Sequence, residues 1–150
     1  MSQRIENNQL TKQIMNKLIE SAKDVRAHAY APYSNFAVGA AVLCTTPAGG
    51  SGEEYRIFAG CNVENVALGL SICAERSAIV KAFSEGCRDI KAIAIVTDAL
   101  KPSSPCGICR QVFYEFNPKM TVILANLDGK VMVKSAKNLL PLAFERLRLE

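Results

Sequence analysis

The sequence predicts an α/β protein, with a three-layer α/β/α sandwich built around a mixed five-stranded sheet. Two observations favour this class. Five short segments have the composition of strands, and helical patterns separate them at two points, so some neighbouring strands must be joined by helical crossovers. The chain is also short, at 150 residues of which 49% are hydrophobic. This length suits one domain, spanning residues 1–150, with a core of its own.

The first predicted element is a helix from about Thr11 to Tyr30. Its apolar residues recur every three or four positions and form one stripe that can face a core. The helix must end before Pro32, because proline disfavours helical geometry in the residue that precedes it. The stripe consists of Leu10, Ile14, Leu18, Ala22, Val25 and Ala29.

Two strands are predicted next, from Phe36 to Leu43 and from Tyr55 to Val63, because both segments are rich in residues that strands favour. The residues between them, TTPAGGSGEE at positions 45–54, are mostly of turn-forming types. The two strands are therefore expected to form a hairpin with a long loop.

A second helix is predicted from about Ser71 to Glu85, with Ser71 as its candidate N-cap and Gly86 as its stop signal. The continuous apolar segment at positions 91–97 that follows is expected to be a buried strand. The apolar face of the helix consists of Ala74, Ala78, Ile79, Ala82 and Phe83.

A third helix is expected to begin at Ser104, a candidate N-cap, with Pro105 in the first turn, where its missing N–H is no loss. Strands are predicted at 120–126 and 131–135, and a short helical segment at 138–147 closes the chain. The predicted order of elements is therefore α-β-β-α-β-α-β-β, followed by the terminal helical segment.

Charge and hydropathy exclude several classes of protein. The formal net charge is +4, and no block of lysine and arginine marks a nucleic-acid-binding arm. No run of about 18 apolar residues is present to span a membrane, and the first ten residues lack the apolar region of a signal peptide. A cytoplasmic location is expected, where reducing conditions disfavour disulfides and cysteine spacing points to metal binding or catalysis.

The cysteine pattern indicates a metal site. Cys106 and Cys109, in the stretch PCGIC, lie on one face in the first turns of the third predicted helix, and Cys73 lies in the first turn of the second. The positive end of a helix dipole favours a thiolate over a thiol. Three thiolates brought together suit zinc, which accepts soft sulfur ligands in tetrahedral geometry.

The number of ligands predicts a catalytic site. Structural zinc sites are normally closed by four protein ligands, whereas catalytic sites keep three and leave the fourth position for water. Glu75, two residues after Cys73, is well placed to take a proton from that water. The neighbouring Arg76 can offset part of the thiolate charge by hydrogen bonding to a sulfur atom.

The other cysteines and the single histidine match no ligand position. Cys44, Cys61 and Cys87 are expected to be small buried apolar residues. His28, on the first predicted helix, is far in sequence from every motif, and we expect it to be a structural histidine.

Five segments stand in order between about Thr11 and Phe144: APYSNFAVGAAVL, GCNVEN, CAERSAI, SPCGICRQ and LLPLAF. Within them, CAE is followed about 30 residues later by PCGIC, which is similar to the metal-binding signature of zinc-dependent deaminases. Together the segments resemble the small homotetrameric nucleoside cytidine deaminases. The resemblance implies the cytidine deaminase-like fold, with zinc held by Cys73, Cys106 and Cys109.

The resemblance also implies which residues bind a nucleoside. Asn62 and Glu64 match the pair that holds the ribose 3′-hydroxyl, which favours a free nucleoside over a nucleic-acid strand. Phe36 matches the aromatic residue that packs against the pyrimidine ring. Phe144 matches the aromatic residue that reaches a neighbouring subunit's site, and the main chain around Ala74 is implied to bind the base.

The implied activity is the hydrolytic deamination of cytidine and 2′-deoxycytidine to uridine and 2′-deoxyuridine, with release of ammonia, in pyrimidine salvage. A zinc-activated water is the nucleophile and Glu75 the proton shuttle. The implied assembly is a homotetramer. The chain departs from the family pattern at Leu68, near which tetrameric members commonly carry a tyrosine, and in the length of the loop at 45–54.

Three alternatives remain open. Blasticidin-type deaminases resemble this chain in size and metal motifs, but the segment NVEN with its ribose-binding pair argues against them. A polynucleotide deaminase would be expected to have a His-Cys-Cys ligand set and a basic, aromatic surface for a strand. A non-enzymatic zinc-stabilised binding module would need a fourth ligand to close its site.

Overall fold

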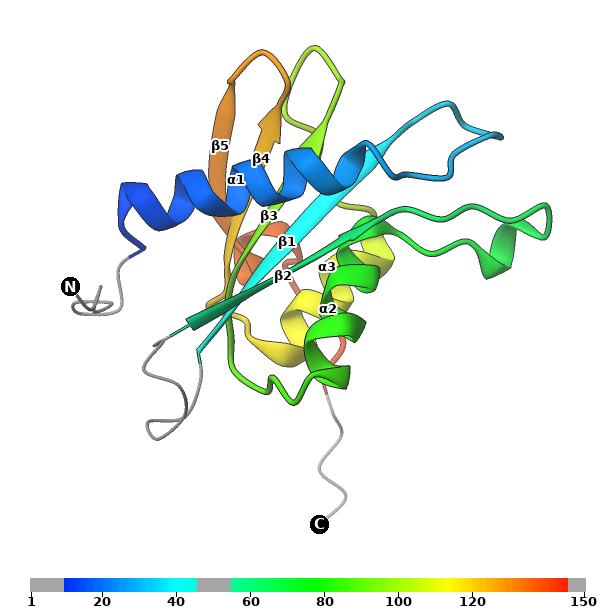
Figure 1. The fold of residues 1–150 in the computed structure, drawn as a ribbon. Helices are drawn as coiled ribbons and strands as arrows, with labels where there is room; N and C mark the ends of the chain where they lie inside the picture. Colours follow the sequence, from blue (N-terminus) through cyan, green and yellow to red (C-terminus); the bar gives the residue numbers. More distant parts are fainter. Residues whose placement is uncertain (1–9, 46–54, 146–150) are drawn as a thin grey trace.

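The computed structural model describes residues 10–45 and 55–145, and Figure 1 colours its elements in chain order. The helices are α1 (Lys12–Arg26), the short 3₁₀ helix η2 (Leu68–Leu70), α2 (Ala74–Ser84), α3 (Gly107–Phe116) and α4 (Ala136–Leu139). The strands are β1 (Val38–Thr45), β2 (Tyr55–Cys61), β3 (Ile90–Thr97), β4 (Thr121–Asn126) and β5 (Val131–Ser135).

The five strands form one mixed sheet in the order β2-β1-β3-β4-β5. β1 is antiparallel to both β2 and β3, and β4 is antiparallel to β5. β3 and β4 are parallel, with Ala94 opposite Ile123. Parallel neighbours need a crossover connection, which α3 supplies here. The predicted mixed five-stranded sheet is confirmed.

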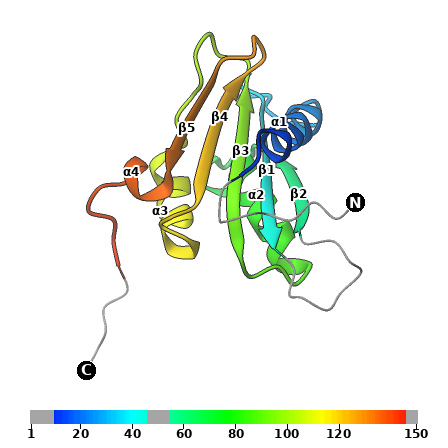
Figure 2. The same ribbon diagram turned by 90° about the vertical axis from the view of Figure 1, so that its left-hand side faces the viewer.

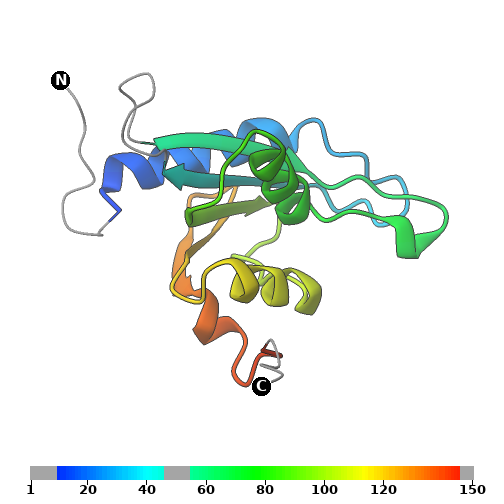
Figure 3. The ribbon, with the colours of Figure 1, turned by 90° about the horizontal axis from the view of Figure 1, so that it is seen from below.

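Helices cover both faces of this sheet, which gives the three predicted layers (Figure 2, Figure 3). α1 packs on one face, and α2 and α3 pack on the other. Alternate residues of a strand point to opposite faces, so β1 contributes to two cores. Ala41 and Leu43 belong to the core under α1, whereas Ala40 and Val42 belong to the core under α2 and α3.

α1 is shorter than the sequence predicts. Thr11 is its N-cap, and the hydroxyl oxygen of Thr11 accepts the Ile14 N–H at 3.3 Å. The helix ends at Arg26 rather than at Tyr30. The Tyr30 N–H donates to the Asn62 carbonyl at 3.0 Å, so pairing with the segment after β2 takes the place of the last helical turn.

Two connecting segments project side by side from the sheet, one between α1 and β1 and the other between β2 and α2 (Figure 1, Figure 3). A parallel bridge between Tyr30 and Val63 joins them. The Glu64 N–H also donates to the Tyr30 carbonyl, at 2.8 Å. The two segments therefore support each other although they are far apart in sequence.

α2 begins later than predicted but ends as expected. Cys73, and not Ser71, is its N-cap. Ile72 is held in extended geometry by its antiparallel bridge to Val63, which prevents an earlier start. Gly86 follows the helix with a φ of 86°, in the left-handed region that glycine adopts without strain.

α3 also begins later than predicted, because Cys106 is its N-cap in place of Ser104. The side chain of Arg110 explains the difference. Its Nε donates to the Pro105 carbonyl at 2.7 Å and its Nη2 donates to the Ser104 hydroxyl at 3.0 Å. The Ser104 hydroxyl is therefore engaged with a side chain of the helix rather than with a backbone N–H of its first turn.

The terminal helix is displaced towards the N-terminus relative to the predicted segment at 138–147. α4 covers only Ala136–Leu139, and its N-cap Ser135 accepts the Asn138 N–H at 3.2 Å. Pro141, which has no N–H to donate, follows shortly after, and the described chain beyond it is not helical. The last two positions of the predicted segment lie outside the described residues.

Two glycines allow helices to approach the sheet closely. A Cβ added at Gly39 would lie 1.9 Å from the Ala22 carbonyl oxygen of α1, and one added at Gly60 would lie 2.5 Å from the Ala78 nitrogen of α2. Neither position has room for a side chain. Both helices are therefore held against the same end of the β1–β2 hairpin.

Two cysteines form a disulfide bond, which contradicts the expectation that the cysteines are not paired. Cys44, near the end of β1, is bonded to Cys87, which follows α2. Both are buried, as predicted, and their Cα atoms are 6.1 Å apart, a normal separation for a disulfide. The two positions are 43 residues apart in the chain, and no local pattern in the sequence indicates that they meet.

The hairpin of β1 and β2 is present as predicted, with Ala40 opposite Gly60. Its loop at positions 46–54 lies outside the described residues, so the prediction of a long loop there is not tested. Within 10–45 and 55–145, no helix has both the length and the apolar character that a membrane span requires.

Candidate active site

A cavity of about 310 Å³ opens where the start of β1, the end of β3 and the first turns of α2 and α3 converge. Its walls combine a thiol-rich corner with apolar, hydroxyl, amide and carboxylate groups, a mixture that suits a small polar ligand. Seven of the residues predicted from the sequence line it: Phe36, Asn62, Glu64, Cys73, Ala74, Glu75 and Cys106.

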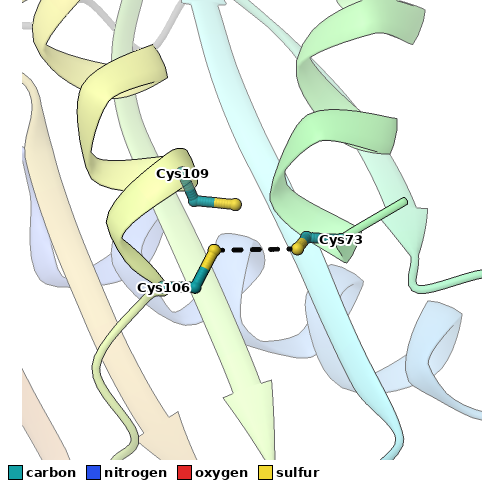
Figure 4. Close-up of side chains that lie close together, drawn as sticks. All are labelled: Cys73, Cys106 and Cys109. Carbon is teal, nitrogen blue, oxygen red and sulfur yellow. Dashed lines mark hydrogen bonds between the residues drawn. The ribbon is translucent and has the colours of Figure 1, made fainter. Parts of the chain in front are cut away.

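Three thiols meet beside this cavity (Figure 4), and two of them, those of Cys73 and Cys106, line it. Cys106 and Cys109, from α3, point towards Cys73 at the start of α2, and the three Sγ atoms lie within 4.8 Å of one another. The Sγ atoms of Cys73 and Cys106 are 3.8 Å apart. A tetrahedral zinc ion with Zn–S distances of about 2.3 Å holds its sulfur ligands roughly 3.8 Å apart, so the donor set fits zinc.

The group contains three ligands. Among the described residues, no histidine, carboxylate or further cysteine joins it. Three protein ligands are typical of a catalytic zinc site, which keeps its fourth position for water.

The thiols share a proton. A hydrogen bond with the Cys109 thiol, aided by Arg76, lowers the pKa of Cys73 to about 5, although burial acts in the opposite direction. The same hydrogen bond raises the pKa of Cys109, together with burial and the nearby charge of Glu75. Cys73 is therefore the thiolate of the pair and Cys109 its donor, and a bound cation would displace the remaining proton.

Arg76 lies directly behind this corner. Its Nη2 donates to the Ser71 carbonyl at 2.9 Å and is 3.9 Å from the Cys73 Sγ. A guanidinium group fixed at that distance stabilises negative charge on the sulfur. Ser71, predicted as a helix cap, thus has a different role, because its carbonyl orients the arginine.

Glu75, in the first turn of α2, is buried beside the thiols and only 5% exposed. Burial raises the pKa of its carboxyl group, and the charge of Cys73 acts in the same direction, while hydrogen bonds with its own N–H and with Cys109 oppose them. A carboxyl group with a raised pKa can both accept and return a proton during a reaction.

Asn62 and Phe36 both line the cavity and are joined by a hydrogen bond. The Asn62 amide donates to the Phe36 carbonyl at 2.9 Å and accepts the Val38 N–H at 2.8 Å. These bonds fix the chain as it enters β1 and leave the Phe36 side chain lining the cavity, 38% exposed. The amide retains one N–H and one lone pair for a ligand.

Glu64 extends the cavity wall along the projecting segment after β2. Its carboxylate accepts the N–H groups of Tyr33 at 2.9 Å and Ser34 at 3.2 Å, and it also accepts the Ser34 hydroxyl. The Ser34 hydroxyl contributes most to lowering the pKa of Glu64; desolvation opposes it, and the N–H groups of Tyr33 and Ser34 lower the pKa further. Glu64 is therefore an ionised acceptor held in a fixed position.

Phe144 does not line the cavity of its own chain. Its side chain is 74% exposed. Its backbone is held by the Gln111 amide, which donates to the Phe144 carbonyl at 2.9 Å and accepts the Phe144 N–H at 3.2 Å. The aromatic ring is thus presented outward, where a neighbouring molecule can contact it.

Comparison with known proteins agrees with this geometry. Residues 12–125 match the family model described as the cytidine and deoxycytidylate deaminase zinc-binding region. The chain belongs to the cytidine deaminase family. The matched range contains the three clustered cysteines and Glu75.

Individual cytidine deaminases support the same assignment. The enzyme of Sporosarcina psychrophila is 47% identical over 133 residues, which are 88% of this chain and 92% of the relative. That of Mycobacterium tuberculosis is 39% identical over 86% of this chain and 88% of the relative. The crystal structure of cytidine deaminase from Burkholderia pseudomallei has 45% identity and a TM-score of 0.77, covering 90% of this chain and all 100% of that one.

Three residues singled out from the sequence lie away from the deaminase site. Leu68, on η2, is 72% exposed and does not line the cavity. Cys61, at the end of β2, is a free half-buried cysteine outside the thiol group. His28 is exposed just beyond α1, where its expected structural role has no visible basis.

Sequence reasoning missed several hydroxyl groups of the deaminase cavity. Ser34, Thr97 and Ser103 all line it. Isolated serine and threonine residues carry no spacing signal of their own. The available clue was position, since Thr97 ends a buried strand and Ser103 lies three residues before Cys106.

Proposed function

We propose that this chain hydrolyses cytidine and 2′-deoxycytidine to uridine and 2′-deoxyuridine, with release of ammonia, as a step of pyrimidine salvage. The observation that carries the proposal is a single cavity in which two of the clustered thiols and the buried Glu75 face Phe36 and Glu64. The names of the similar proteins, all cytidine deaminases, support this substrate.

The proposed zinc ligands are Cys73, Cys106 and Cys109. When bound, zinc supplies a water molecule whose pKa is lowered towards roughly 7. Three thiolates would weaken this acidifying effect through their negative charge. Arg76, 3.9 Å from the Cys73 sulfur, offsets part of that charge.

Glu75 is the proposed proton shuttle. It takes a proton from the attacking water and delivers it to the ring nitrogen N3 of the pyrimidine. The oxygen of that water bonds to C4 of the ring. Glu75 then carries the proton left on this oxygen to the exocyclic amine, and the C4–N bond breaks to release ammonia. Its burial among the thiols supports this role, because a raised pKa lets the carboxyl group hold the proton between the two transfers.

The nucleoside is proposed to lie in the cavity, beside Phe36 and the two connecting segments that project from the sheet. Phe36 packs against the pyrimidine ring, and the main chain at Ala74 contacts the base. Asn62 and Glu64 bind the ribose 3′-hydroxyl. A 3′-phosphodiester would place a second negative charge beside the ionised Glu64, so a free nucleoside is favoured over a polynucleotide.

The alternatives are less well supported. A blasticidin-type substrate is disfavoured because the similar proteins are named cytidine deaminases and because the NVEN segment contributes two polar residues to the cavity. A purely structural zinc site is disfavoured because the thiol group, within the described part of the chain, has three members.

The proposal also covers the organisation of the protein. We infer one domain over residues 1–150, a homotetramer and a cytoplasmic location. The outward-facing Phe144 ring supports the tetramer, because it is proposed to complete the cavity of a neighbouring subunit. The free thiols of the proposed zinc site favour a reducing compartment, whereas the Cys44–Cys87 disulfide is of a kind that is rare there.

The direct test combines two measurements on one sample. Purified protein is incubated with cytidine and the ultraviolet absorbance of the base is followed, while the zinc content of the same protein is determined. We expect the cytidine spectrum to be lost and about one zinc per chain to be present. Bound zinc without deamination of cytidine or 2′-deoxycytidine would overturn the proposed function.

The role of Glu75 is tested by Glu75→Gln, which keeps the size of the side chain and removes its ability to carry a proton. We expect turnover to fall by at least about 10²–10⁴-fold while the zinc content is unchanged. Glu20→Gln, at an exposed position of α1, is the matched control and should retain full activity. Near-normal turnover by the Glu75 variant would remove this residue from the mechanism.

A further inference from the structure

We propose that Arg26 is a positioning residue for the deaminase reaction, because it ties together two walls of the nucleoside cavity. Arg26 is the last residue of α1 and does not line the cavity itself. The inference rests on the proposed nucleoside substrate, and it concerns how tightly the cavity binds that substrate.

The guanidinium group of Arg26 contacts two separate segments. Its Nε donates to the Ala37 carbonyl at 3.0 Å. Its Nη2 lies 2.7 Å from the Asp98 carboxylate. The Arg26 side chain is only 17% exposed, whereas that of Asp98 is 44% exposed, so the arginine is largely enclosed by the segments that it joins.

Ala37 belongs to the first of these walls. It stands between Phe36 and Val38, which both line the cavity. Asn62 holds the residues on either side through the Phe36 carbonyl and the Val38 N–H, and Arg26 holds the carbonyl between them. Two side chains therefore hold the backbone of three consecutive residues, from which the Phe36 side chain projects.

Asp98 lies next to the second wall. It directly follows Thr97, which ends β3, is 2% exposed and lines the cavity. The Thr97 hydroxyl is 3.4 Å from the hydroxyl of Ser103, and it also accepts the Ala99 N–H at 3.4 Å. The ion pair with Arg26 thus anchors the start of the loop that leads to Cys106.

The close approach of α1 to β1 brings Arg26 within reach of both walls. A Cβ added at Gly39 would lie 2.8 Å from the Arg26 Cβ, so only glycine allows this separation. The position also suits a cation, because the C-terminal end of a helix carries partial negative charge.

The expected effect is on substrate binding rather than on folding or chemistry. A partly exposed ion pair adds little to stability. Cavity walls that are already fixed lose less conformational freedom when a ligand binds. Loosening them should therefore raise KM, while the thiol corner, which Arg26 does not contact, keeps kcat nearly unchanged.

Arg26→Met tests the inference, because it keeps the length of the side chain and removes both contacts. We expect the KM for cytidine to rise about tenfold, with kcat changed by less than about twofold and zinc content unchanged. The matched control is Arg56→Met, which removes the Arg56–Glu85 ion pair of 3.0 Å at the opposite end of the hairpin. Equal KM values in the two variants, or a joint loss of kcat and zinc in folded Arg26→Met, would overturn the inference.

Asp98→Asn provides a second, milder test that decides the question if Arg26→Met does not fold. It weakens one contact and leaves the bond to Ala37, so we expect a KM about threefold above that of the unmodified protein. The affinity for the product uridine, measured by calorimetry, should also fall more in Arg26→Met than in Asp98→Asn. An unchanged KM and an unchanged uridine affinity would refute the inference.

The outcomes separate this inference from the proposed function. If the unmodified protein does not deaminate cytidine, the proposed function fails. If it does and neither variant changes KM, only the role of Arg26 fails.

Discussion

Helix α2 lies between two groups of cysteines, one of free thiols and one that forms a disulfide. At its N-terminal end, Cys73 lies with Cys106 and Cys109 as a group of free thiols. Just beyond its C-terminal end, Cys87 forms a disulfide with Cys44. The side chains are chemically identical at the two ends, so their surroundings decide whether they are available to a metal ion or cross-linked.

The surroundings differ mainly in charge. The free thiols lie at two helix N-termini and beside the Arg76 guanidinium, so a thiolate is stabilised. Cys73 and Cys106 also line the cavity. Cys44 and Cys87 are 1% and 6% exposed, but Cys109 is 0% exposed and belongs to the same hydrophobic core, so burial does not distinguish the two groups. Helix N-termini and the nearby guanidinium therefore separate the proposed metal ligands from the disulfide more clearly than cysteine spacing does.

The largest expected effect comes from breaking the thiol end. Cys106→Ser should weaken zinc binding by more than about 100-fold, because even changes behind the ligands of a metal commonly cost 10–100-fold. Deaminase activity should be lost with the metal. Zinc content after dialysis and turnover of cytidine are the measurements, with Cys61→Ser as the control at a free cysteine outside the group. Full zinc occupancy in the Cys106 variant would contradict the ligand assignment.

The disulfide end should respond in stability alone. Cys87→Ala removes a cross-link between residues 43 positions apart, and we expect the free energy of unfolding to fall by roughly 2–4 kcal/mol. Reduction of the unmodified protein should have a similar effect. Denaturant titration measures the loss, and zinc content and KM should stay unchanged. A concurrent loss of zinc would show that the two ends of α2 are not independent.

A carboxylate with a shifted pKa lies near each of the two cysteine groups, so the groups can also be compared through their response to pH. Near the thiol end, the Ser34 hydroxyl lowers the pKa of Glu64 below its usual 4.5. Near the disulfide end, burial raises the pKa of Asp89, but hydrogen bonds from Thr45 and Lys91 outweigh it and lower the pKa below 3.8. Because the folded-state pKa is lowered, each carboxylate is fully charged at a pH above its ordinary pKa. It loses this charge as the pH falls through the folded-state pKa.

The smallest expected effect is therefore a change in acid sensitivity. Ser34→Ala should raise the pKa of Glu64, so the ratio of KM at about pH 5 to KM at about pH 7 increases, by no more than about twofold. Thr45→Val, which removes the corresponding hydroxyl at the disulfide end, should leave that ratio as it is in the unmodified protein. Equal ratios in the two variants would mean that ionised Glu64 does not contribute to nucleoside binding.

Much of the fold is predictable because periodicity reports burial. The stripe of α1 places Ile14, Leu18 and Ala22 in the core, as expected. Element ends are less predictable, since partners far away in the sequence decide them. Tyr30 leaves the helical pattern to pair with Asn62, and the start of α2 is delayed by the bridge that holds Ile72.

The candidate site likewise combines contacts that a local sequence pattern predicts with contacts between distant residues that it does not. Cys106 and Cys109 are three positions apart, so their common direction follows from helix geometry. The disulfide between Cys44 and Cys87 has no such local signal. The contact of Arg26 with Ala37 and Asp98 is equally hidden, because it depends on how α1 packs on the sheet.

The separation of the thiols along the chain has a consequence for folding. Cys73 and Cys106 are 33 positions apart, and the whole of β3 lies between them. In the folded structure, the packing of α2 and α3 on one face of the sheet brings their sulfur atoms together, so the thiol group is a contact between distant parts of the chain. Tight zinc uptake should therefore mark molecules that have formed this long-range contact. The zinc content of a preparation would thus set a lower limit on the fraction of chains that reached the native topology, without reference to turnover.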